Sequence, residues 1–226
     1  MAEQTVLLIL MLLRHALEGD EAVRAGRQME MKERCMVEGI TELSACKVGL
    51  VGFGDIARAA AERLVPFGCE LYYYTKHRRL PEEEKKYHVT YLPLEELAEK
   101  SDIVSLHCAV TEETRNLVDA ALLRRMKPTA YLINTARGDL VDNEALRQAL
   151  LEGRIAGAGL DTLSPEPVPA GHPLDGAAAG RSIGKWSWHP TWAALQRHPS
   201  VGPCHMWRNV EHLAAGERPD NIVNGL

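Results

Sequence analysis

Hydrophobic and polar positions alternate in a regular way along most of the chain. Apolar runs of four to six residues, each typical of a buried strand, are separated by longer segments with apolar residues at helical spacing. The apolar runs lie at 47–52, 70–75, 103–107, 130–133 and 156–160. The helical patterns lie at 3–25, 56–67, 94–100, 120–126, and 143–152. Strands that alternate with helices predict an α/β fold with a doubly wound parallel sheet.

Three segments depart from this alternation. We expect residues 28–44 to be irregular and residues 76–86 to form a charged loop. After Leu174 the pattern stops, and three of the four tryptophans then fall within seven residues. A short helix is expected at 209–215, followed by an extended tail.

The run from Thr5 to Leu13 is apolar enough to resemble the core of a signal peptide. The chain opens with Met-Ala-Glu-Gln and has no basic residue before the run, which is also too short to span a bilayer. We therefore predict a buried helix and no membrane partner.

Bulk properties exclude several classes of function. A net charge of −5 gives no basic footprint, which argues against a nucleic-acid partner. The five cysteines are widely spaced and form no CxxC pair, which argues against a metal site or a disulfide framework. Reduced cysteines are typical of the cytoplasm, and we predict that location.

A glycine-rich turn follows the strand at 47–52. The sequence Gly52-Phe-Gly54-Asp-Ile-Ala57 fits the G-x-G-x-x-A pattern of a strand that runs into a helix. Gly52 permits the tight turn, Gly54 lets the backbone approach a pyrophosphate, and Ala57 allows close packing of helix and strand. The pattern predicts a dinucleotide site, a Rossmann-type domain; the alternative is a glycine turn that binds nothing.

The second strand ends in a polar and basic sequence. An NAD site usually has an acidic residue there for the ribose 2′-hydroxyl, but this chain has Thr75, and Lys76 and Arg78 follow it. A basic loop favours a 2′-phosphate, so we predict NADP(H) and keep NAD(H) as the alternative. The loop has a second interpretation, a solvated surface that faces the acidic residues at 82–84.

The strand at 130–133 leads into the polar sequence Asn-Thr-Ala-Arg137-Gly-Asp. Ligands bind at the tips of parallel strands, and an arginine there suits a planar carboxylate. Asp161 and Glu166 follow the next strand. Taken singly, Arg137 is better explained by a surface salt bridge, and Glu166 by a loop carboxylate before a proline.

Together these motifs resemble the D-isomer-specific 2-hydroxyacid dehydrogenases. The resemblance covers about 1–174 and 209–224. It rests on the sequences at 51–57, 105–107, 111–114, 126–128, 133–139 and 159–167. Within the family the chain looks most like the glyoxylate, hydroxypyruvate and phosphoglycerate dehydrogenases. The resemblance therefore implies reduction of a small 2-oxo acid or oxidation of a 2-hydroxy acid.

The resemblance also implies roles for single residues. Arg137 would bind the substrate carboxylate and carbonyl oxygen, and Glu166 would stabilise the charged form of a histidine that protonates this oxygen. Asp161 and the backbone at Thr135 and Ala136 would hold the nicotinamide carboxamide. The further cofactor contacts that the family motifs imply are Asp55, Ile56, His107 and Thr114. Relatives are usually homodimers through the cofactor domain, and the apolar first helix would suit such an interface or the core.

Two features depart from the family. Residue 1 resembles the helix that enters the family's cofactor domain, so we expect this sequence to lack the N-terminal substrate domain. We interpret residues 1–206 as the dinucleotide-binding domain and 207–226 as a remnant of the substrate domain. The family's Pro-His-x-Gly-Gly sequence is also missing, although His189 lies 23 positions after Glu166, close to where the family places its histidine.

A shifted reading frame would explain the second departure. Tryptophan has a single codon, and a shifted reading from Lys185 onward permits the complete family motif, with its histidine encoded across Pro190 and Thr191. His189 is then an accidental neighbour in an exposed loop; otherwise it is the acid/base. The sequence is also consistent with a non-catalytic NAD(P)-binding regulatory protein, or with an inactive fragment that does not fold stably.

Overall fold

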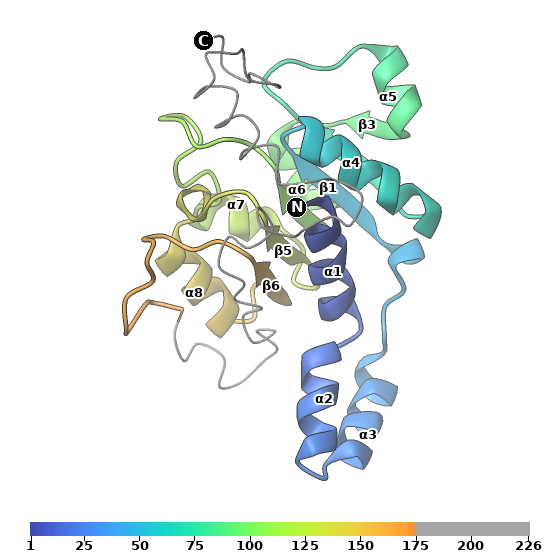
Figure 1. Cartoon of the computed structure of the whole chain (residues 1–226), viewed down its shortest axis with the longest axis vertical. Coiled ribbons are helices and arrows are strands. Elements are labelled where there is room, and N and C mark those ends of the chain that lie inside the picture. The colour runs from blue at the N-terminus through green and yellow to red at the C-terminus, as the bar shows by residue number, and fades with distance from the viewer. Residues whose placement is uncertain (175–226) are drawn as a thin grey trace, which may run out of the picture. The chain divides into compact units, whose positions relative to one another are not determined.

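The structure is a computed structural model of the chain and describes residues 1–174 (Figure 1). Three sequence predictions fall outside the described residues: the helix at 209–215, the shifted frame around Lys185, and the position of His189.

Within residues 1–174, the centre of the fold is a six-stranded parallel sheet. The strands are β1 (Lys47–Val51), β2 (Glu70–Tyr74), β3 (Val89–Tyr91), β4 (Ile103–Leu106), β5 (Tyr131–Asn134) and β6 (Gly157–Leu160). They lie in the order β3-β2-β1-β4-β5-β6, and every pairing between neighbours is parallel. The predicted doubly wound sheet is therefore confirmed.

The register brings the ends of the strands to a common edge. Val51 at the end of β1 pairs with Tyr74 on one side and with Leu106 on the other. Leu106 in turn pairs with Asn134, and Asn134 with Leu160. The polar sequences that follow these strands therefore start side by side at one edge of the sheet, where such sheets bind ligands.

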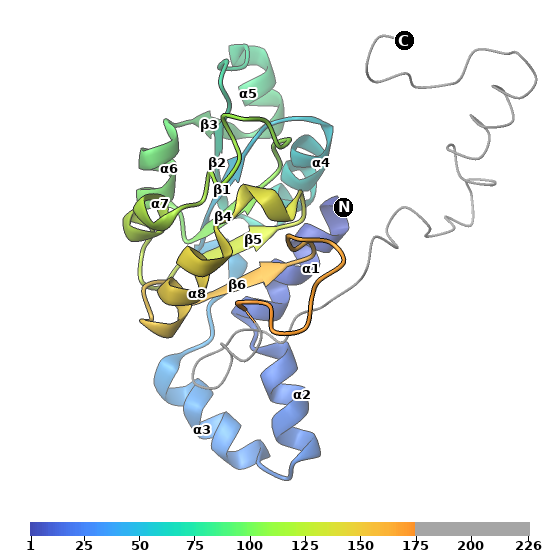
Figure 2. The ribbon, with the colours of Figure 1, turned by 90° about the vertical axis from the view of Figure 1, so that its left-hand side faces the viewer.

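Helices cover both faces of the sheet, as Figure 2 shows in edge view. One apolar layer joins α1 (Ala2–Leu13) and α4 (Asp55–Leu64) to alternate strand residues such as Leu50 and Ile133. The other layer joins α6 (Leu94–Lys100), α7 (Ala120–Arg125) and α8 (Asn143–Leu151) to strand residues on the opposite face of the sheet, such as Val104 and Leu132. Both faces are thus buried, which explains why the strands read as continuous apolar runs.

The first helix belongs to the core of the chain. Leu8, Ile9, Leu12 and Leu13 of α1 are buried, and the helix packs against α4, β5 and β6. Gly159 leaves room for it, because a Cβ there would lie 3.2 Å from Leu8 and Leu12. The predicted buried helix is confirmed, and no helix of residues 1–174 is long and apolar enough to cross a membrane.

Three element predictions are wrong. The helix expected at 3–25 is broken at His15, which adopts a left-handed φ of 50°, and α2 (Ala16–Arg24) starts after it. Residues 28–44 contain a helix, α3 (Gln28–Glu38), and the expected charged loop contains α5 (Pro81–Tyr87), followed by the unpredicted strand β3. Short 3₁₀ turns lie at Leu43–Ala45, Val65–Phe67 and Gly138–Leu140.

The missed helices share a weak apolar pattern. None of residues 28–37 in α3 is buried, and Tyr87 is the buried residue of α5, so the described side chains of neither helix form the repeated apolar face that predicts helices. Figure 1 shows α2 and α3 side by side, extending away from the sheet. They pack against each other, and α2 also packs against α1.

Candidate cofactor and substrate site

The turn between β1 and α4 has the geometry of a phosphate-binding loop. Gly52 has a φ of +94°, and a Cβ there would lie 2.7 Å from the backbone nitrogen of Cys108, so a side chain has neither the conformation nor the space. At Gly54 a Cβ would meet none of the described atoms within 4 Å. The turn is crowded on its inner side and open on its outer side.

The first turn of α4 is open to an anion. The residue that caps the helix is Gly54, so no side chain occupies the free N–H groups. The side chain of Asp55 is fully exposed and that of Ile56 is 45% exposed, which leaves the backbone of these residues accessible. Free N–H groups and the positive end of the helix dipole suit the pyrophosphate of a dinucleotide.

The loop after β2 carries the predicted phosphate-binding cations. The Thr75 hydroxyl donates to the carbonyl of His77 at 2.6 Å, which curls the loop at the strand end. Lys76 Nζ lies 3.0 and 2.9 Å from the two carboxylate oxygens of Glu113, in the loop after β4. An ion pair therefore connects the loops that follow β2 and β4.

Arg78, in the loop before α5, is bound to that helix. Its Nε and Nη2 donate to the two oxygens of Glu84 at 2.8 and 2.9 Å, and its guanidinium lies over the ring of Tyr91. Glu84 also accepts a hydrogen bond from Tyr73 at 2.7 Å, and the Arg78 guanidinium holds the pKa of the Glu84 carboxyl below its usual value. In this respect the loop fits the interpretation of a basic surface that faces nearby acids.

Arg79 is a candidate that the sequence prediction did not include. Its Nη2 donates to the carbonyl of Phe53, at 3.2 Å, within the glycine turn. Its buried Nε has no partner among the described residues. The guanidinium of Arg79 thus lies between the β2 loop and the glycine turn, where an arginine accommodates a 2′-phosphate in NADP sites.

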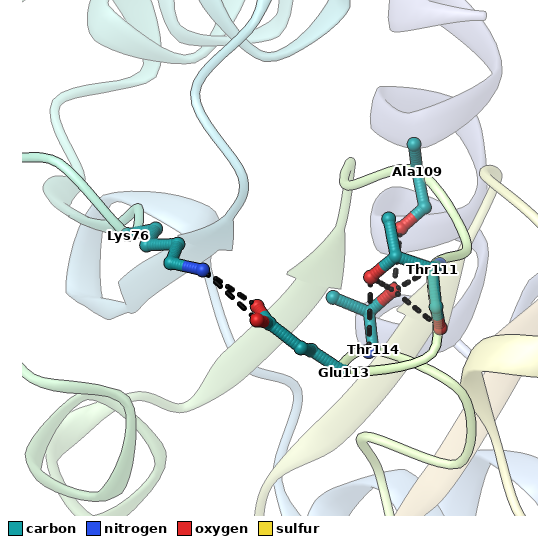
Figure 3. Close-up of polar contacts among 5 residues, drawn as sticks. All are labelled: Lys76, Ala109, Thr111, Glu113 and Thr114. Carbon is teal, nitrogen blue, oxygen red and sulfur yellow. Dashed lines mark hydrogen bonds and ion pairs between the residues drawn. The ribbon is translucent and has the colours of Figure 1, made fainter.

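Thr114 shapes the loop after β4 (Figure 3). Its hydroxyl donates to the carbonyl of Ala109 at 2.7 Å and accepts from the backbone N–H of Thr111 at 2.7 Å. These bonds close a tight turn that holds Glu113 toward Lys76. The predicted cofactor contact of Thr114 stays a prediction, since the hydroxyl is engaged within the loop.

His107 follows β4 directly behind the glycine turn. Its Nε2 lies 3.0 Å from the hydroxyl of Ser105, and its buried Nδ1 has no partner among the described residues. Burial lowers the pKa of His107 to about 4, so the ring is neutral at physiological pH. A neutral ring with an unused nitrogen fits a hydrogen bond to an uncharged part of a cofactor.

Buried neutral groups hold the tips of β5 and β6. The side chain of Asn134 is 1% exposed; it donates to the carbonyl of Arg137 at 2.8 Å and accepts from the N–H of Ala136 at 3.0 Å. Two residues of α1 that sequence reasoning missed complete this end of the site. Thr5 Oγ1 lies 3.0 Å from Thr135 Oγ1, and Gln4 donates to Asp161 at 3.1 Å.

Arg137 and Glu166 lie on exposed loops that contact each other near their bases. Arg137 donates to the carbonyl of Ala136 at 2.7 Å and has no carboxylate partner among the described residues, so a surface salt bridge of Arg137 is not found there. A Cβ at Gly138 would lie 2.1 Å from the carbonyl carbon of Leu163, which shows how closely the two backbones approach. Glu166 lies exposed between two prolines.

The described residues contain no group of three or more histidine, cysteine or acidic side chains that is able to hold a metal ion. They do contain a glycine turn, an uncapped helix start and a row of polar strand tips along one edge of a parallel sheet. This combination defines a Rossmann-type dinucleotide-binding domain, and its residues fit a dinucleotide cofactor.

Comparison with known proteins identifies the family. Residues 6–181 match the family model described as the D-isomer specific 2-hydroxyacid dehydrogenase, NAD binding domain. The chain therefore belongs to the D-isomer specific 2-hydroxyacid dehydrogenases and contains their NAD-binding domain, as the motifs implied.

Single relatives agree with this assignment. The chain is 41% identical to a glyoxylate reductase of Thermofilum pendens, over 99% of this chain and 64% of the relative. It is 39% identical to a human glyoxylate reductase/hydroxypyruvate reductase, over 76% of this chain and 52% of the relative. The crystal structure of an NAD-complexed D-isomer specific 2-hydroxyacid dehydrogenase from Lactobacillus delbrueckii matches with a TM-score of 0.62 and 36% identity, over 76% of this chain and 51% of that one. The chain thus spans between about half and two thirds of the length of these relatives.

Proposed function

We propose that this protein transfers hydride between NADPH and a small 2-oxo acid, with glyoxylate and hydroxypyruvate as the substrates to test first. The observation that carries the proposal is Arg137, a guanidinium without a carboxylate partner among the described residues, at the tip of a strand beside the dinucleotide site. The similarity to a glyoxylate reductase and a glyoxylate reductase/hydroxypyruvate reductase supports the same substrate class.

Each site residue has a defined role in this proposal. The reduced nicotinamide supplies the hydride. Arg137 binds the substrate carboxylate and the carbonyl oxygen through its paired N–H donors. His189 donates a proton to that oxygen, and Glu166 stabilises the charged form of the imidazole. Asn134 is a positioning residue, because its side chain fixes the carbonyl of Arg137.

The proposed cofactor contacts fall into three groups along the sheet edge. We assign the pyrophosphate to the backbone of Gly52, Gly54, Asp55 and Ile56. We assign the adenosine end to Thr75, Lys76, Arg78, His107 and Thr114, and add Arg79. We assign the nicotinamide end to Thr135, Ala136 and Asp161. Cations follow β2, and Thr75 stands where an NAD site usually has an acidic residue. Both features support NADP(H) over NAD(H).

Dissociation constants for the two reduced cofactors test the cofactor preference directly. We expect NADPH to bind the purified chain more tightly than NADH, because only NADPH carries the phosphate that the cations bind. Equal affinity for the two cofactors, or tighter binding of NADH, would contradict this preference.

The substrate role of Arg137 is tested by turnover. Steady-state oxidation of NADPH by glyoxylate is measured for the chain, for Arg137→Ala and for Arg147→Ala, an exposed arginine on α8 that pairs with Glu144. Loss of a charged, two-pronged contact lowers kcat/KM by about 100-fold or more, whereas Arg147→Ala leaves it unchanged. Turnover that survives in Arg137→Ala would reject the proposed role. Cofactor binding without turnover by the unaltered chain would instead favour a non-catalytic regulatory protein.

We also propose the domain division and the homodimer implied by the resemblance, with residues 1–206 as the dinucleotide-binding domain and 207–226 as a remnant of the substrate domain. The apolar face of α1 is used within the core, so the exposed apolar side chains of α2 and α3 are the better dimer surface. They are Val23, Met29, Met36 and Val37. Light scattering that gives a monomer for the unaltered chain, or a dimer that survives Met36→Glu with Val37→Glu, would contradict this assignment.

A further inference from the structure

The ion pair between Lys76 and Glu113 crosses the adenosine end of the candidate site. Lys76 lies in the loop after β2, and Glu113 lies in the loop after β4, on the other side of β1 in the sheet. Figure 3 shows the ammonium group extended toward the carboxylate, with both oxygens of Glu113 within 3.0 Å of Nζ. The cation proposed for the 2′-phosphate is therefore already bound to an anion of the chain.

The position of Glu113 is set by its own loop. Thr111 and Thr114 on either side are joined by a bond from the Thr111 N–H at 2.7 Å, and Thr114 is anchored to the carbonyl of Ala109. The backbone that carries Glu113 is consequently held in a hydrogen-bonded turn. The pair raises the pKa of Lys76 and lowers the pKa of Glu113, so both groups are charged at neutral pH.

The cations of the β2 loop differ in how readily their partners are displaced. Glu84, the partner of Arg78, is 13% exposed and also accepts from Tyr73, so the pair is locked into α5. Glu113 is 72% exposed and contacts water on most of its surface. An exposed ion pair contributes little stability, so an incoming anion exchanges with Glu113 far more easily than with Glu84.

We propose that Glu113 is a specificity-determining residue that competes with the 2′-phosphate of the cofactor for Lys76. This inference rests on the proposed NADP(H) site. When NADPH binds, the ammonium group changes partner from carboxylate to phosphate, and the released carboxylate then lies close to a second anion. NADH has a neutral hydroxyl at the same position and leaves the ion pair intact. Glu113 therefore lowers the affinity for NADPH but not for NADH. The difference in affinity between the two cofactors becomes smaller, and NADH can bind as well.

The test compares two substitutions that remove the same charge one residue apart. Glu113→Gln frees Lys76, while Glu112→Gln removes an exposed carboxylate that has no partner among the described residues. Dissociation constants are measured by calorimetry for NADPH and NADH. Adenosine 2′,5′-bisphosphate and 5′-AMP are added as probes of the adenosine end alone, and a thermal scan confirms that each variant is folded.

Glu113→Gln is expected to bind NADPH and the bisphosphate about two- to fivefold more tightly, since an exposed pair of this kind is weak. Its affinities for NADH and 5′-AMP stay unchanged, and Glu112→Gln changes none of the four by as much. Unchanged or weaker NADPH binding by Glu113→Gln overturns the inference. Equal gains for NADPH and NADH, or equal gains in both variants, also overturn it, because they show only a general effect of net charge.

Lys76→Ala separates this inference from the cofactor proposal. Weaker NADPH binding by Lys76→Ala together with no gain in Glu113→Gln refutes the competition but keeps the phosphate site. If Lys76→Ala leaves the affinity for NADPH unchanged, then Lys76 does not contact the phosphate, and both the site assignment of Lys76 and the competition are wrong. In the double variant Lys76→Ala with Glu113→Gln, the gain of Glu113→Gln disappears if the competition is correct.

Discussion

The two ends of the candidate cofactor site are built in opposite ways. At the adenosine end, an exposed ion pair joins the loops that follow β2 and β4, with Lys76 and Glu113 each about 70% exposed. At the nicotinamide end, the contacts of Asn134 and Thr135 are neutral and buried, and these residues are 1% and 3% exposed. There the backbone of Gly138 also touches that of Leu163.

This difference separates the fixed part of the site from its adjustable part. Buried hydrogen bonds are costly to leave unpaired, so the loop that carries Arg137 has one stable arrangement. Exposed ion pairs contribute little stability and respond to salt, so substitution of the residues proposed to select the cofactor should leave the fold intact. Reaction geometry and cofactor choice are thereby placed on parts of the sheet edge that differ in stability.

The largest effect is expected from Gly138→Ala. The new Cβ would meet backbone atoms of Leu163 and Ser164, which cannot rotate away, so the β5 and β6 loops must separate. We expect the free energy of unfolding in urea to fall by about 3 kcal/mol.

Gly54→Ala is the matched control, because its Cβ meets no described atom within 4 Å. This variant should keep its stability to within about 0.5 kcal/mol and yet bind NADPH more weakly, since the pyrophosphate approaches the same surface. Equal stability of Gly138→Ala and Gly54→Ala would contradict the rigid nicotinamide end.

The next effect is expected from Asn134→Ala. The substitution leaves the carbonyl of Arg137 and the N–H of Ala136 without their partner, at a cost of about 2 kcal/mol in unfolding free energy. Because Arg137 then loses its fixed position, kcat should fall more than the affinity for NADPH. Gln148→Ala, which removes a bond to Glu152 on the surface of α8, serves as the control. A fall in cofactor affinity alone would show that Asn134 does not position Arg137.

A smaller effect is expected from pH. The pKa of His107 is about 4 in the folded chain and near 6.5 when unfolded, so the unfolded state binds more protons between these values. The stability contributed by the neutral ring is complete above pH 6.5 and is lost as the pH falls toward 4. His107→Asn should remove about 1–2 kcal/mol of this pH dependence, measured by urea unfolding without cofactor. His88→Asn, at an exposed histidine, should leave the slope unchanged; the same slope in all three proteins would refute the assignment.

The smallest effect is expected from salt. Raising NaCl from about 0.05 to 0.5 M should weaken NADPH binding a few-fold and leave NADH binding nearly unchanged, because exposed charges are screened. Titrations of both cofactors at each salt concentration measure this difference. A loss that is the same for both cofactors would place the salt-sensitive contact at the shared pyrophosphate rather than at the β2 loop.

The sequence predicted the parts of the fold that carry a repeated apolar pattern. Five of the strands and the glycine turn were found because the strands are buried on both faces and the turn requires glycine at Gly52. The strand β3 and the helices α3 and α5 were missed because they are short or lack a buried face. The break at His15 lies in a run that reads as continuous, since a single left-handed residue leaves no pattern.

The site was predicted at the level of motifs but not of contacts. Arg137, Asp161 and Thr135 were proposed as site residues because they follow strands, and the structure shows that these strands end side by side at one edge. Gln4 and Arg79 were missed, since their roles depend on contacts with Asp161 and with the carbonyl of Phe53, which lie 157 and 26 positions away in the sequence. The pairing of Lys76 with Glu113, 37 positions apart, is likewise a product of the strand order. No spacing rule within the sequence reveals it.

The position of β1 between β2 and β4 has a consequence for protein engineering. The cations lie in one continuous segment, residues 75–79, whereas their exposed counterion lies at residue 113, beyond two further strands. A chimera that transplants only the first segment into another member of the family would carry the basic residues without Glu113, the carboxylate proposed to compete for Lys76. Recombination with crossovers before residue 75 and after residue 114 transfers the basic segment together with Glu113. The recipient then keeps its own residues at the nicotinamide end of the site.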